Sequence, residues 1–305
     1  MILCCSSVCL LDTARAYGNE QNIGKLLQNV DRSQVFVTSK VWYDSLQFHS
    51  TIETVRSSMK ELKVSFVDLY LIHWPQCYDE IEWMDCGSAK GNWRSSWRAL
   101  EKLFAEGALQ AIGVSNFDSN LLKQMMDTTL VVPHVVQNYM DPFSIDFEML
   151  ALAKEAGIQF QVLVICVVSP PPFRANIWFQ AYSSARSLAS EAKKDGNQVK
   201  DEWTRRYQLA WAALQNLAED VKLRVSSDDH VGPVEVLVQW VLGLGGIAIP
   251  ATSNPAHASS NLRVTSWELT REETDALTSR FQQLRQLPVD QLFAEHADQL
   301  LKTEL

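Results

Sequence analysis

The strongest constraint on the fold of this chain is a regular alternation of short apolar segments with longer amphipathic segments. Seven short segments rich in apolar and β-branched residues have the pattern of strands; in chain order they contain VCLL, VFVTSK, VDLYLIHW, AIGVSN, HVVQN, GIQFQ and GIAIP. Between them, segments such as TIETVRSSMKEL repeat apolar residues at intervals of three and four, as in a helix that packs on a sheet. This order predicts βαβ units and a parallel sheet.

The number of predicted strands points to a barrel that lacks one unit. An α/β chain of 305 residues suits a (β/α)8 TIM barrel, which folds as a single domain. Such a barrel closes with eight strands, because strand number, tilt and stagger are linked. Seven strands are predicted here, so one is missing. We therefore predict one domain over residues 1–305.

Three segments depart from the alternation. Residues 188–225 have a polar first half and a helical second half, which predicts a loop insertion that leads into a helix. Residues 289–305 are amphipathic and predict a terminal helix. The first residues, MILCCSSVCLL, are apolar, but no basic segment precedes them as in a signal sequence, and we interpret them as a strand.

Charge and composition limit the kinds of partner. The net charge of −9 argues against nucleic acid or an anionic membrane as the main partner, since both require a basic protein face. The apolar run from Val162 to Val168 is far shorter than the roughly 20 residues that span a bilayer. The six cysteines show no CxxC pair and no regular spacing, so we predict no metal site, no disulfide framework and reduced thiols in the cytoplasm.

Four polar side chains follow predicted strands at their carboxyl ends, where barrels of this kind place their chemistry: Asp12, Tyr17, Lys40 and His73. Reduction of a carbonyl group needs a proton donor at oxygen while hydride reaches carbon, and a tyrosine with its pKa lowered by a lysine ammonium suits that task. Asp12 could pair with Lys40, and His73 could hydrogen-bond the substrate oxygen. The alternatives are a helix-capping aspartate and a histidine satisfied within the core.

The motifs DTAxxYGNE, SKVW, LYLIHWP, AIGVSNF and IPATSNP, in this order, resemble those of the aldo-keto reductases. The resemblance extends from Leu10 to Leu269. It implies a (β/α)8 barrel that reduces aldehyde or ketone groups of small molecules with hydride from NAD(P)H. It also implies that Asp12, Tyr17, Lys40 and His73 form the catalytic tetrad, with Tyr17 as the general acid.

The same resemblance implies a set of residues around the cofactor and the substrate. Ser115, Asn116 and Gln137 would hydrogen-bond the nicotinamide carboxamide. The remaining cofactor residues would be Tyr182 under the nicotinamide ring, Ser183 on the pyrophosphate side, and Thr252 and Asn261 at the ribose and adenine. Trp42 and Trp74 would line the substrate pocket, although core packing is an equally simple role for each.

The cofactor preference implied by the resemblance is altered at two positions. Ala251 and His257 stand where the family usually has a lysine and an arginine that bind the 2′-phosphate of NADP. NADPH is the expected cofactor, but the loss of both cations weakens discrimination against NADH, because charge-assisted phosphate contacts contribute about 1.5–3 kcal/mol each.

Two further departures from the family bear on the fold. Eleven residues precede Asp12, whereas the family has a whole strand and helix there, so the missing unit is the first one. Either the gene model has lost this unit or the natural protein lacks it, and in the second case an unpaired sheet edge is expected. Residues 162–180, a run of 19, separate GIQFQ from AYSS, which the family joins directly. We favour a retained intron translated in frame over a loop insertion, which barrels also tolerate.

Two functions follow from these observations. The first is a cytoplasmic, monomeric NAD(P)H-dependent reductase of small carbonyl compounds. The alternative is a catalytically impaired barrel that acts as a nucleotide-binding or regulatory protein. The complete tetrad favours the enzyme, whereas the missing first unit and the segment before Tyr182 favour the alternative.

Overall fold

A computed structural model of the chain describes residues 2–5, 8–81, 83–87, 91–163, 196–225, 231–250, 259–260 and 263–292. The chain divides into two compact units. Unit 1 comprises Met1–Asn138 and Asp146–Leu163, and unit 2 comprises Tyr139–Ile145 and Val164–Leu305. The assignment of residues 1–305 to a single domain stays a prediction.

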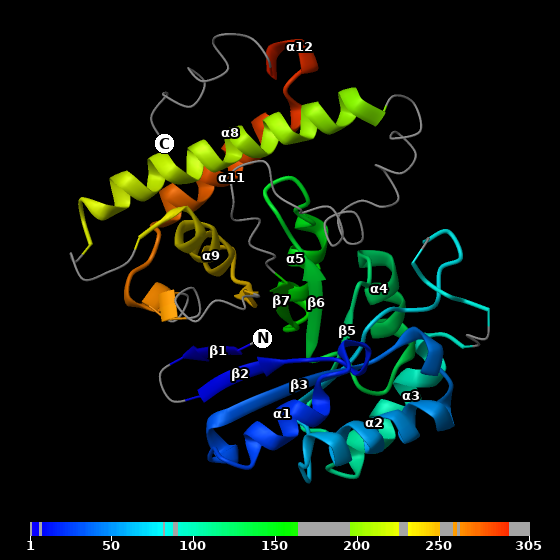
Figure 1. Ribbon diagram of the computed structural model, residues 1–305. Helices are drawn as coiled ribbons and strands as arrows, with labels where there is room; N and C mark the ends of the chain where they lie inside the picture. The colour runs from blue at the N-terminus through cyan, green and yellow to red at the C-terminus, as the bar shows by residue number, and fades with distance from the viewer. Residues whose placement is uncertain are drawn as a thin grey trace. The chain divides into compact units, whose positions relative to one another are not determined.

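The sheet of unit 1 follows the chain in order. Its strands after the first are β2 (Val8–Asp12), β3 (Val35–Val41), β4 (Leu69–Ile72), β5 (Ile112–Ser115), β6 (Val135–Tyr139) and β7 (Gln159–Leu163). From β2 to β6 each strand pairs in parallel with the next, and β7 follows β6 in the sheet (Figure 1). These six strands, with β8 (Ile247–Ala248) in unit 2, confirm the seven predicted from sequence.

The amino-terminal strand lies in the sheet, but in the opposite direction. β1 (Ile2–Cys5) pairs antiparallel with β2, with Ile2 opposite Leu11 and Cys5 opposite Val8. A hairpin is what so short a connection allows, because a parallel neighbour needs a crossover of about a dozen residues or more. β1 therefore takes the first place in the strand order, on the side of β2 where the sequence predicts that the first unit is missing.

Helices alternate with the strands of unit 1. They are α1 (Glu20–Leu27), α2 (Phe48–Leu62), α3 (Trp93–Ala105), α4 (Ser119–Thr128) and α5 (Phe147–Glu155), with short 3-10 turns at Arg15–Tyr17, Arg32–Gln34 and Tyr43–Ser45. In Figure 1, α1, α2 and α3 lie side by side along the sheet. α3 buries Trp93, Trp97 and Leu100, which are spaced three and four apart, and Asn92 caps its first turn.

The centre of the sheet is the core of unit 1. All four residues of β4, from Leu69 to Ile72, are fully buried. A parallel strand covered on both faces requires such a continuous apolar run, because both of its faces are removed from water. This rigid strand leads directly into His73, which is also buried.

Unit 2 is mainly helical in its described part. It contains α8 (Gly196–Lys222), α9 (Pro233–Gly243), a 3-10 turn at Val264–Ser266, α11 (Arg271–Gln286) and α12 (Val289–Leu292). α8 confirms the helix predicted in the second half of residues 188–225, but it already begins at Gly196, within the polar first half that was predicted as a loop. Trp240 of α9 and Phe281 of α11 pack edge to face, with ring centroids 5.1 Å apart.

Two predicted segments are described only at their beginnings. Val162 and Leu163, the first residues of the predicted insert 162–180, continue strand β7, and residues 164–180 lie outside the described part of the chain. The predicted terminal helix 289–305 begins as α12 at Val289, and residues beyond Leu292 also lie outside it. Across the described residues, the helices are all too short or too polar to cross a bilayer.

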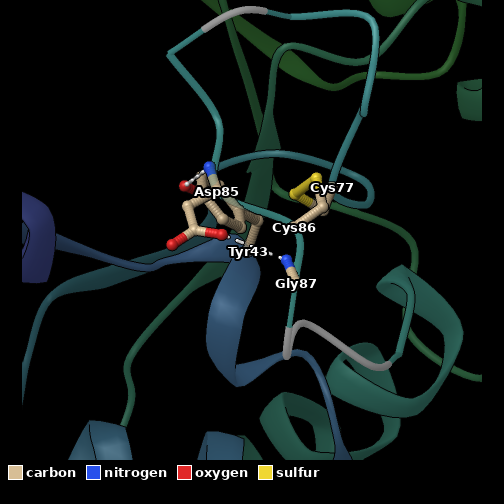
Figure 2. The surroundings of a disulfide bond; sticks show 5 residues. All are labelled: Tyr43, Cys77, Asp85, Cys86 and Gly87. Atoms are coloured by element: carbon tan, nitrogen blue, oxygen red, sulfur yellow. Dashed lines mark hydrogen bonds between the residues drawn. A yellow bond between two sulfur atoms is a disulfide. The ribbon is translucent and has the colours of Figure 1, made fainter.

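The cysteines correct one expectation. Cys77 and Cys86 form a disulfide, with Cα atoms 5.7 Å apart (Figure 2), and Cys9 is disulfide-bonded as well. The prediction of reduced thiols without disulfides is therefore wrong. The spacing of the cysteines did not predict this bond. Cys77 and Cys86 are brought together by a loop that folds back on itself, and not by a CxxC turn that the sequence would reveal.

Close packing of α1 on α2 yields a stability prediction at Gly24. A Cβ atom added there would lie 2.1 Å from the backbone oxygen of Glu61. In an open helix, alanine would be more stable than glycine by about 1 kcal/mol. We expect Gly24→Ala instead to lower the free energy of unfolding by about 2–3 kcal/mol, because the backbone of α1 or α2 must move to make room for the added methyl group.

Urea unfolding followed by circular dichroism measures this change. The exposed Gln21 in the same helix provides the control, since Gln21→Ala should change stability by less than about 0.5 kcal/mol. Equal stability of Gly24→Ala and the wild type would contradict the close approach of the two helices.

Candidate active site

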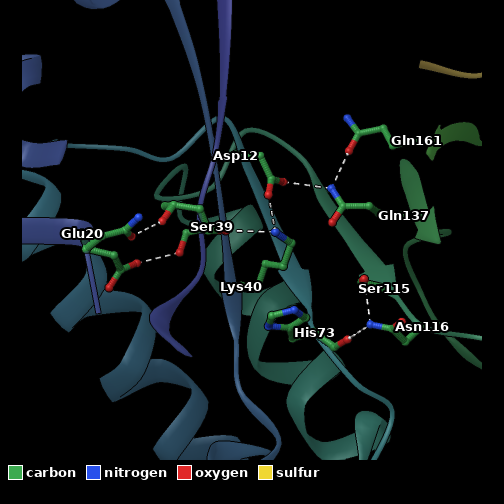
Figure 3. Close-up of polar contacts among 11 residues, drawn as sticks. Asp12, Glu20, Ser39, Lys40, His73, Ser115, Asn116, Gln137 and Gln161 are labelled. Carbon is green, nitrogen blue, oxygen red and sulfur yellow. Dashed lines mark hydrogen bonds and ion pairs between the residues drawn. The ribbon is translucent and has the colours of Figure 1, made fainter. Parts of the chain in front are cut away.

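The site is built on a buried ion pair between neighbouring strands. Asp12 ends β2, and Lys40 lies near the end of β3, which pairs with β2 in parallel. The Lys40 Nζ atom donates to Asp12 Oδ1 at 2.6 Å and to the Thr13 carbonyl oxygen at 3.0 Å (Figure 3). Lys40 is 0% exposed. A buried ammonium group is tolerated only with such partners, because an unpaired charge is costly to remove from water.

Tyr17 enters the site from the short turn after β2. The turn Arg15–Tyr17 ends at Gly18, whose φ of 63° lies in the left-handed region that glycine tolerates. The Lys40 Nζ atom lies 5.2 Å from the centre of the Tyr17 ring. The Tyr17 ring also meets the His73 ring edge-on, with centroids 5.7 Å apart, and 39% of Tyr17 remains exposed.

His73 follows β4 directly and is fixed through its backbone. Its N–H donates to the Val41 carbonyl oxygen at 3.0 Å, and its own carbonyl oxygen accepts from Asn116 Nδ2 at 2.8 Å. Burial, together with the positive charge of Lys40, holds the pKa of the His73 imidazole well below its usual value. The imidazole is therefore neutral near pH 7.

The structure thus brings together all four side chains predicted as the tetrad. One expected electrostatic effect is wrong, however. Burial of Tyr17, with a smaller contribution from the Asp12 carboxylate, raises its pKa above the ordinary value rather than lowering it. Lys40 does not outweigh these effects because Asp12, at 2.6 Å, offsets its charge. The Tyr17 hydroxyl therefore keeps its proton at neutral pH.

The ends of β5 and β6 add amide and hydroxyl groups beside the tetrad. Asn116 has a left-handed φ of 59°, and its Nδ2 atom also contacts Ser115 Oγ at 3.2 Å. Gln137 Nε2 donates to Asp12 Oδ2 at 2.9 Å and to Gln161 Oε1 at 3.1 Å. Both hydrogen bonds described for the Gln137 side chain come from Nε2, so its side-chain oxygen Oε1 is suited to accept from an amide. These groups fit a nicotinamide carboxamide.

The predicted pocket tryptophans lie next to His73. The Trp42 and His73 ring centroids are 4.8 Å apart, and Trp74, the next residue along the chain, is buried. The cofactor residues predicted further along the chain are not described by the structure: Tyr182, Ser183, Thr252 and Asn261, together with the altered positions Ala251 and His257.

Sequence reasoning missed a second buried carboxylate, behind Lys40. Glu20, at the start of α1, is 1% exposed and accepts a hydrogen bond from Ser39 Oγ at 2.6 Å (Figure 3). It also accepts from Ser58 Oγ at 3.1 Å. Ser39 precedes Lys40, so the two side chains point to opposite faces of β3. Glu20 thereby anchors α1 and the turn that carries Tyr17. Its signal was its place in the DTAxxYGNE motif.

Gln161 was also missed. It lies on β7, and its side-chain oxygen accepts from Gln137 at 3.1 Å, so it holds the amide that contacts Asp12. Alternation along GIQFQ gave no signal, because Gln161 shares a strand face with Gln159, which is exposed, and its partner Gln137 lies on another strand.

Comparisons with known proteins identify the family. The model of the Aldo/keto reductase family matches residues 6–168. An aldo-keto reductase of Mycolicibacterium vanbaalenii is 30% identical over 270 residues, which is 88% of this chain and 77% of that protein. A glyoxal reductase of Bacillus subtilis is 25% identical over 272 residues, covering 88% of this chain and 76% of its own.

Solved structures give the same result. The crystal structure of a mutant of Gox0644 in complex with NADPH is 26% identical, with a TM-score of 0.62, over 88% of this chain and 78% of that one. An aldo-keto reductase from a deep-sea metagenome library has a TM-score of 0.65 at 24% identity over 88% of this chain and 80% of its own, which supports the fold. The chain therefore belongs to the aldo/keto reductase family of NAD(P)H-dependent oxidoreductases, with the (β/α)8 barrel fold and carbonyl reduction as its activity.

Proposed function

We propose that this chain reduces the carbonyl group of a small aldehyde or ketone, with Tyr17 donating the proton to the carbonyl oxygen. The observation that carries the proposal is the cluster of Tyr17, Lys40, Asp12 and His73 at the ends of three adjacent strands. Because Tyr17 is partly exposed and the ion pair behind it is buried, the hydroxyl is the group that a substrate would meet.

Each residue of the cluster has a distinct part in this proposal. Lys40 uses two of its three N–H donors on Asp12 and Thr13, which leaves one to stabilise the Tyr17 oxygen as it loses its proton. Asp12 keeps the ammonium in place. His73, which is neutral, donates a hydrogen bond to the substrate oxygen and orients it toward Tyr17.

The bound nicotinamide nucleotide supplies the hydride. Ser115, Asn116 and Gln137 would hold its carboxamide, since they present a hydroxyl and amide groups beside the tetrad (Figure 3). We further propose, as the sequence predicted, that Tyr182, Ser183, Thr252 and Asn261 complete the cofactor site. Trp42 and Trp74 would exclude water from the reacting atoms.

We propose NADPH as the main cofactor, with NADH accepted as well, because Ala251 and His257 offer no cations to a 2′-phosphate. We also propose a monomer, since one chain supplies the whole cluster, working in the cytoplasm where these nucleotides are available. A solely regulatory role is disfavoured, because a buried ion pair beside a tyrosine ring suits proton transfer rather than nucleotide binding alone.

The first prediction concerns Tyr17. Removal of its hydroxyl in Tyr17→Phe should lower kcat for aldehyde reduction by about 10²–10⁴-fold, because the proton donor is lost. The ring remains, so NADPH affinity should be unchanged. Steady-state kinetics and NADPH titration by tryptophan fluorescence measure the two effects. Full activity in Tyr17→Phe would refute the assignment.

The second prediction concerns pH. The raised pKa of Tyr17 keeps its proton on, and the lowered pKa of His73 keeps the imidazole neutral, through the neutral range. We expect kcat/KM for reduction to stay level from about pH 7 to pH 9, since neither group changes its charge there. A profile measured at saturating NADPH that fell through this range, but lay flat in Tyr17→Phe, would show that Tyr17 ionises earlier than proposed.

The third prediction concerns cofactor choice. We expect Ala251→Lys and His257→Arg each to raise the preference for NADPH over NADH by about tenfold or more, because each restores a charge-assisted phosphate contact. The ratio of the two dissociation constants, measured by fluorescence titration, gives the preference. A wild-type preference near a thousandfold, with no gain in either variant, would sink the proposal.

A further inference from the structure

The bond between Cys77 and Cys86 lies in the loop that joins the catalytic strand β4 to α3. Cys77 is four residues beyond His73, and Cys86 lies seven residues before α3 begins at Trp93. The described residues of this loop form turns and bends but no helix or strand. The disulfide is thus a covalent tie across an irregular segment next to the active site (Figure 2).

The tied loop carries an aromatic side chain back to the site. Trp83 lies between the two cysteines, and its ring is 5.7 Å from that of Trp74 and 6.1 Å from that of Trp42. Trp42 is in turn 4.8 Å from the His73 ring. Because 41% of Trp83 is exposed, one part of the ring packs on the tryptophans and the rest is open to a ligand. Large apolar groups bound at His73 would therefore extend onto Trp83.

The hydrogen bonds described for this part of the loop are mostly local. The Asp85 N–H donates to the Tyr43 hydroxyl at 3.1 Å, and the Gly87 N–H turns back to Asp85 Oδ1 at 3.1 Å (Figure 2). Met84 is buried and donates its N–H to the Ile81 carbonyl oxygen at 2.8 Å. The bonds within the loop fix its turns, whereas the bond to Tyr43 joins it to another part of the fold. The disulfide therefore adds a strong constraint to a stretch that is otherwise held by turns.

Both cysteines are only partly buried, so small thiols can reach the bond. Two thiol molecules would break the Sγ–Sγ bond, supply two electrons and two protons to Cys77 and Cys86, and leave as one disulfide. A disulfide reagent would reverse the step. The atoms and electrons of this exchange balance without any group beyond the thiol and disulfide themselves.

We propose that Cys77 and Cys86 form a thiol–disulfide switch that fixes Trp83 against Trp42 and Trp74 and so controls the preference for bulky apolar carbonyl compounds. The inference rests on the proposed function. In the oxidised state Trp83 is an ordered wall of the substrate site. In the reduced state the loop gains conformational freedom, and Trp83 no longer presents a fixed surface.

The test compares two aldehydes in two redox states of the full-length chain. Naphthaldehyde is large enough to reach Trp83, whereas propanal contacts the tetrad alone. Reduction with dithiothreitol should lower the ratio of kcat/KM for naphthaldehyde to that for propanal by about tenfold, the effect of losing one or two aromatic contacts. Alkylation and mass spectrometry confirm the state of Cys77 and Cys86 in each sample.

Two variants isolate the pair from the other disulfide at Cys9. The double variant Cys77→Ser, Cys86→Ser should have the low ratio and should not respond to dithiothreitol. Trp83→Leu should keep the disulfide but have the low ratio in both states. A double variant that still responds, or a wild-type ratio unchanged by reduction of the pair, would overturn the proposal.

A readout without turnover separates the switch from the proposed function. Hydrogen exchange at the Asp85 amide, which donates to Tyr43, should quicken when the pair is reduced. If neither aldehyde is reduced in either redox state, the proposed function fails. The rate of hydrogen exchange at the Asp85 amide then tests the thiol–disulfide switch by itself. Equal exchange in both states, or free thiols at Cys77 and Cys86 in the presence of glutathione disulfide, would overturn it.

Discussion

The buried ion pair between Asp12 and Lys40 is the interaction on which the site depends. Neither group can remain charged out of water unless its hydrogen-bonding atoms find partners, and the structure meets this demand across several strands. Lys40 contacts Asp12 and Thr13, while the second oxygen of Asp12 accepts from Gln137, which is held by Gln161. The pair therefore fixes the register of β2, β3, β6 and β7 at the edge where Tyr17 and His73 meet.

The site combines residues on or beside the strands of the sheet with an aromatic residue, Trp83, on a loop outside the sheet. Asp12 and Lys40 lie on neighbouring parallel strands, and His73 directly follows the next strand, which is fully buried. The aromatic wall is different, because Trp83 is carried by an irregular loop tied by a disulfide. The residues proposed for proton transfer thus lie on or beside regular strands, whereas Trp83 lies in an irregular loop of the kind that often carries specificity.

The first hairpin of the chain supports the strand that carries Asp12. β1 runs antiparallel beside β2, with Ile2 opposite Leu11. This pairing satisfies backbone groups along one side of β2. Because Asp12 lies at the end of β2, this pairing also steadies the strand that carries half of the ion pair.

The seven strands, the helices between them and the places of Asp12, Lys40 and His73 at strand ends could all be predicted from the sequence, because periodicity and strand-end position are local properties of the chain. The catalytic roles of these residues and of Tyr17 came from the resemblance to the family and stay a prediction. Four other features became visible in the folded chain alone: the antiparallel direction of β1, the Cys77–Cys86 bond, the anchoring of Glu20 by Ser39 and Ser58, and the raised pKa of Tyr17. Each of these depends on burial or on which distant residues become neighbours. The distance between two residues along the chain determines neither their burial nor their neighbours in the fold. The effect of Lys40 on the pKa of Tyr17, for example, depends on how close Asp12 lies to the Lys40 ammonium group in space.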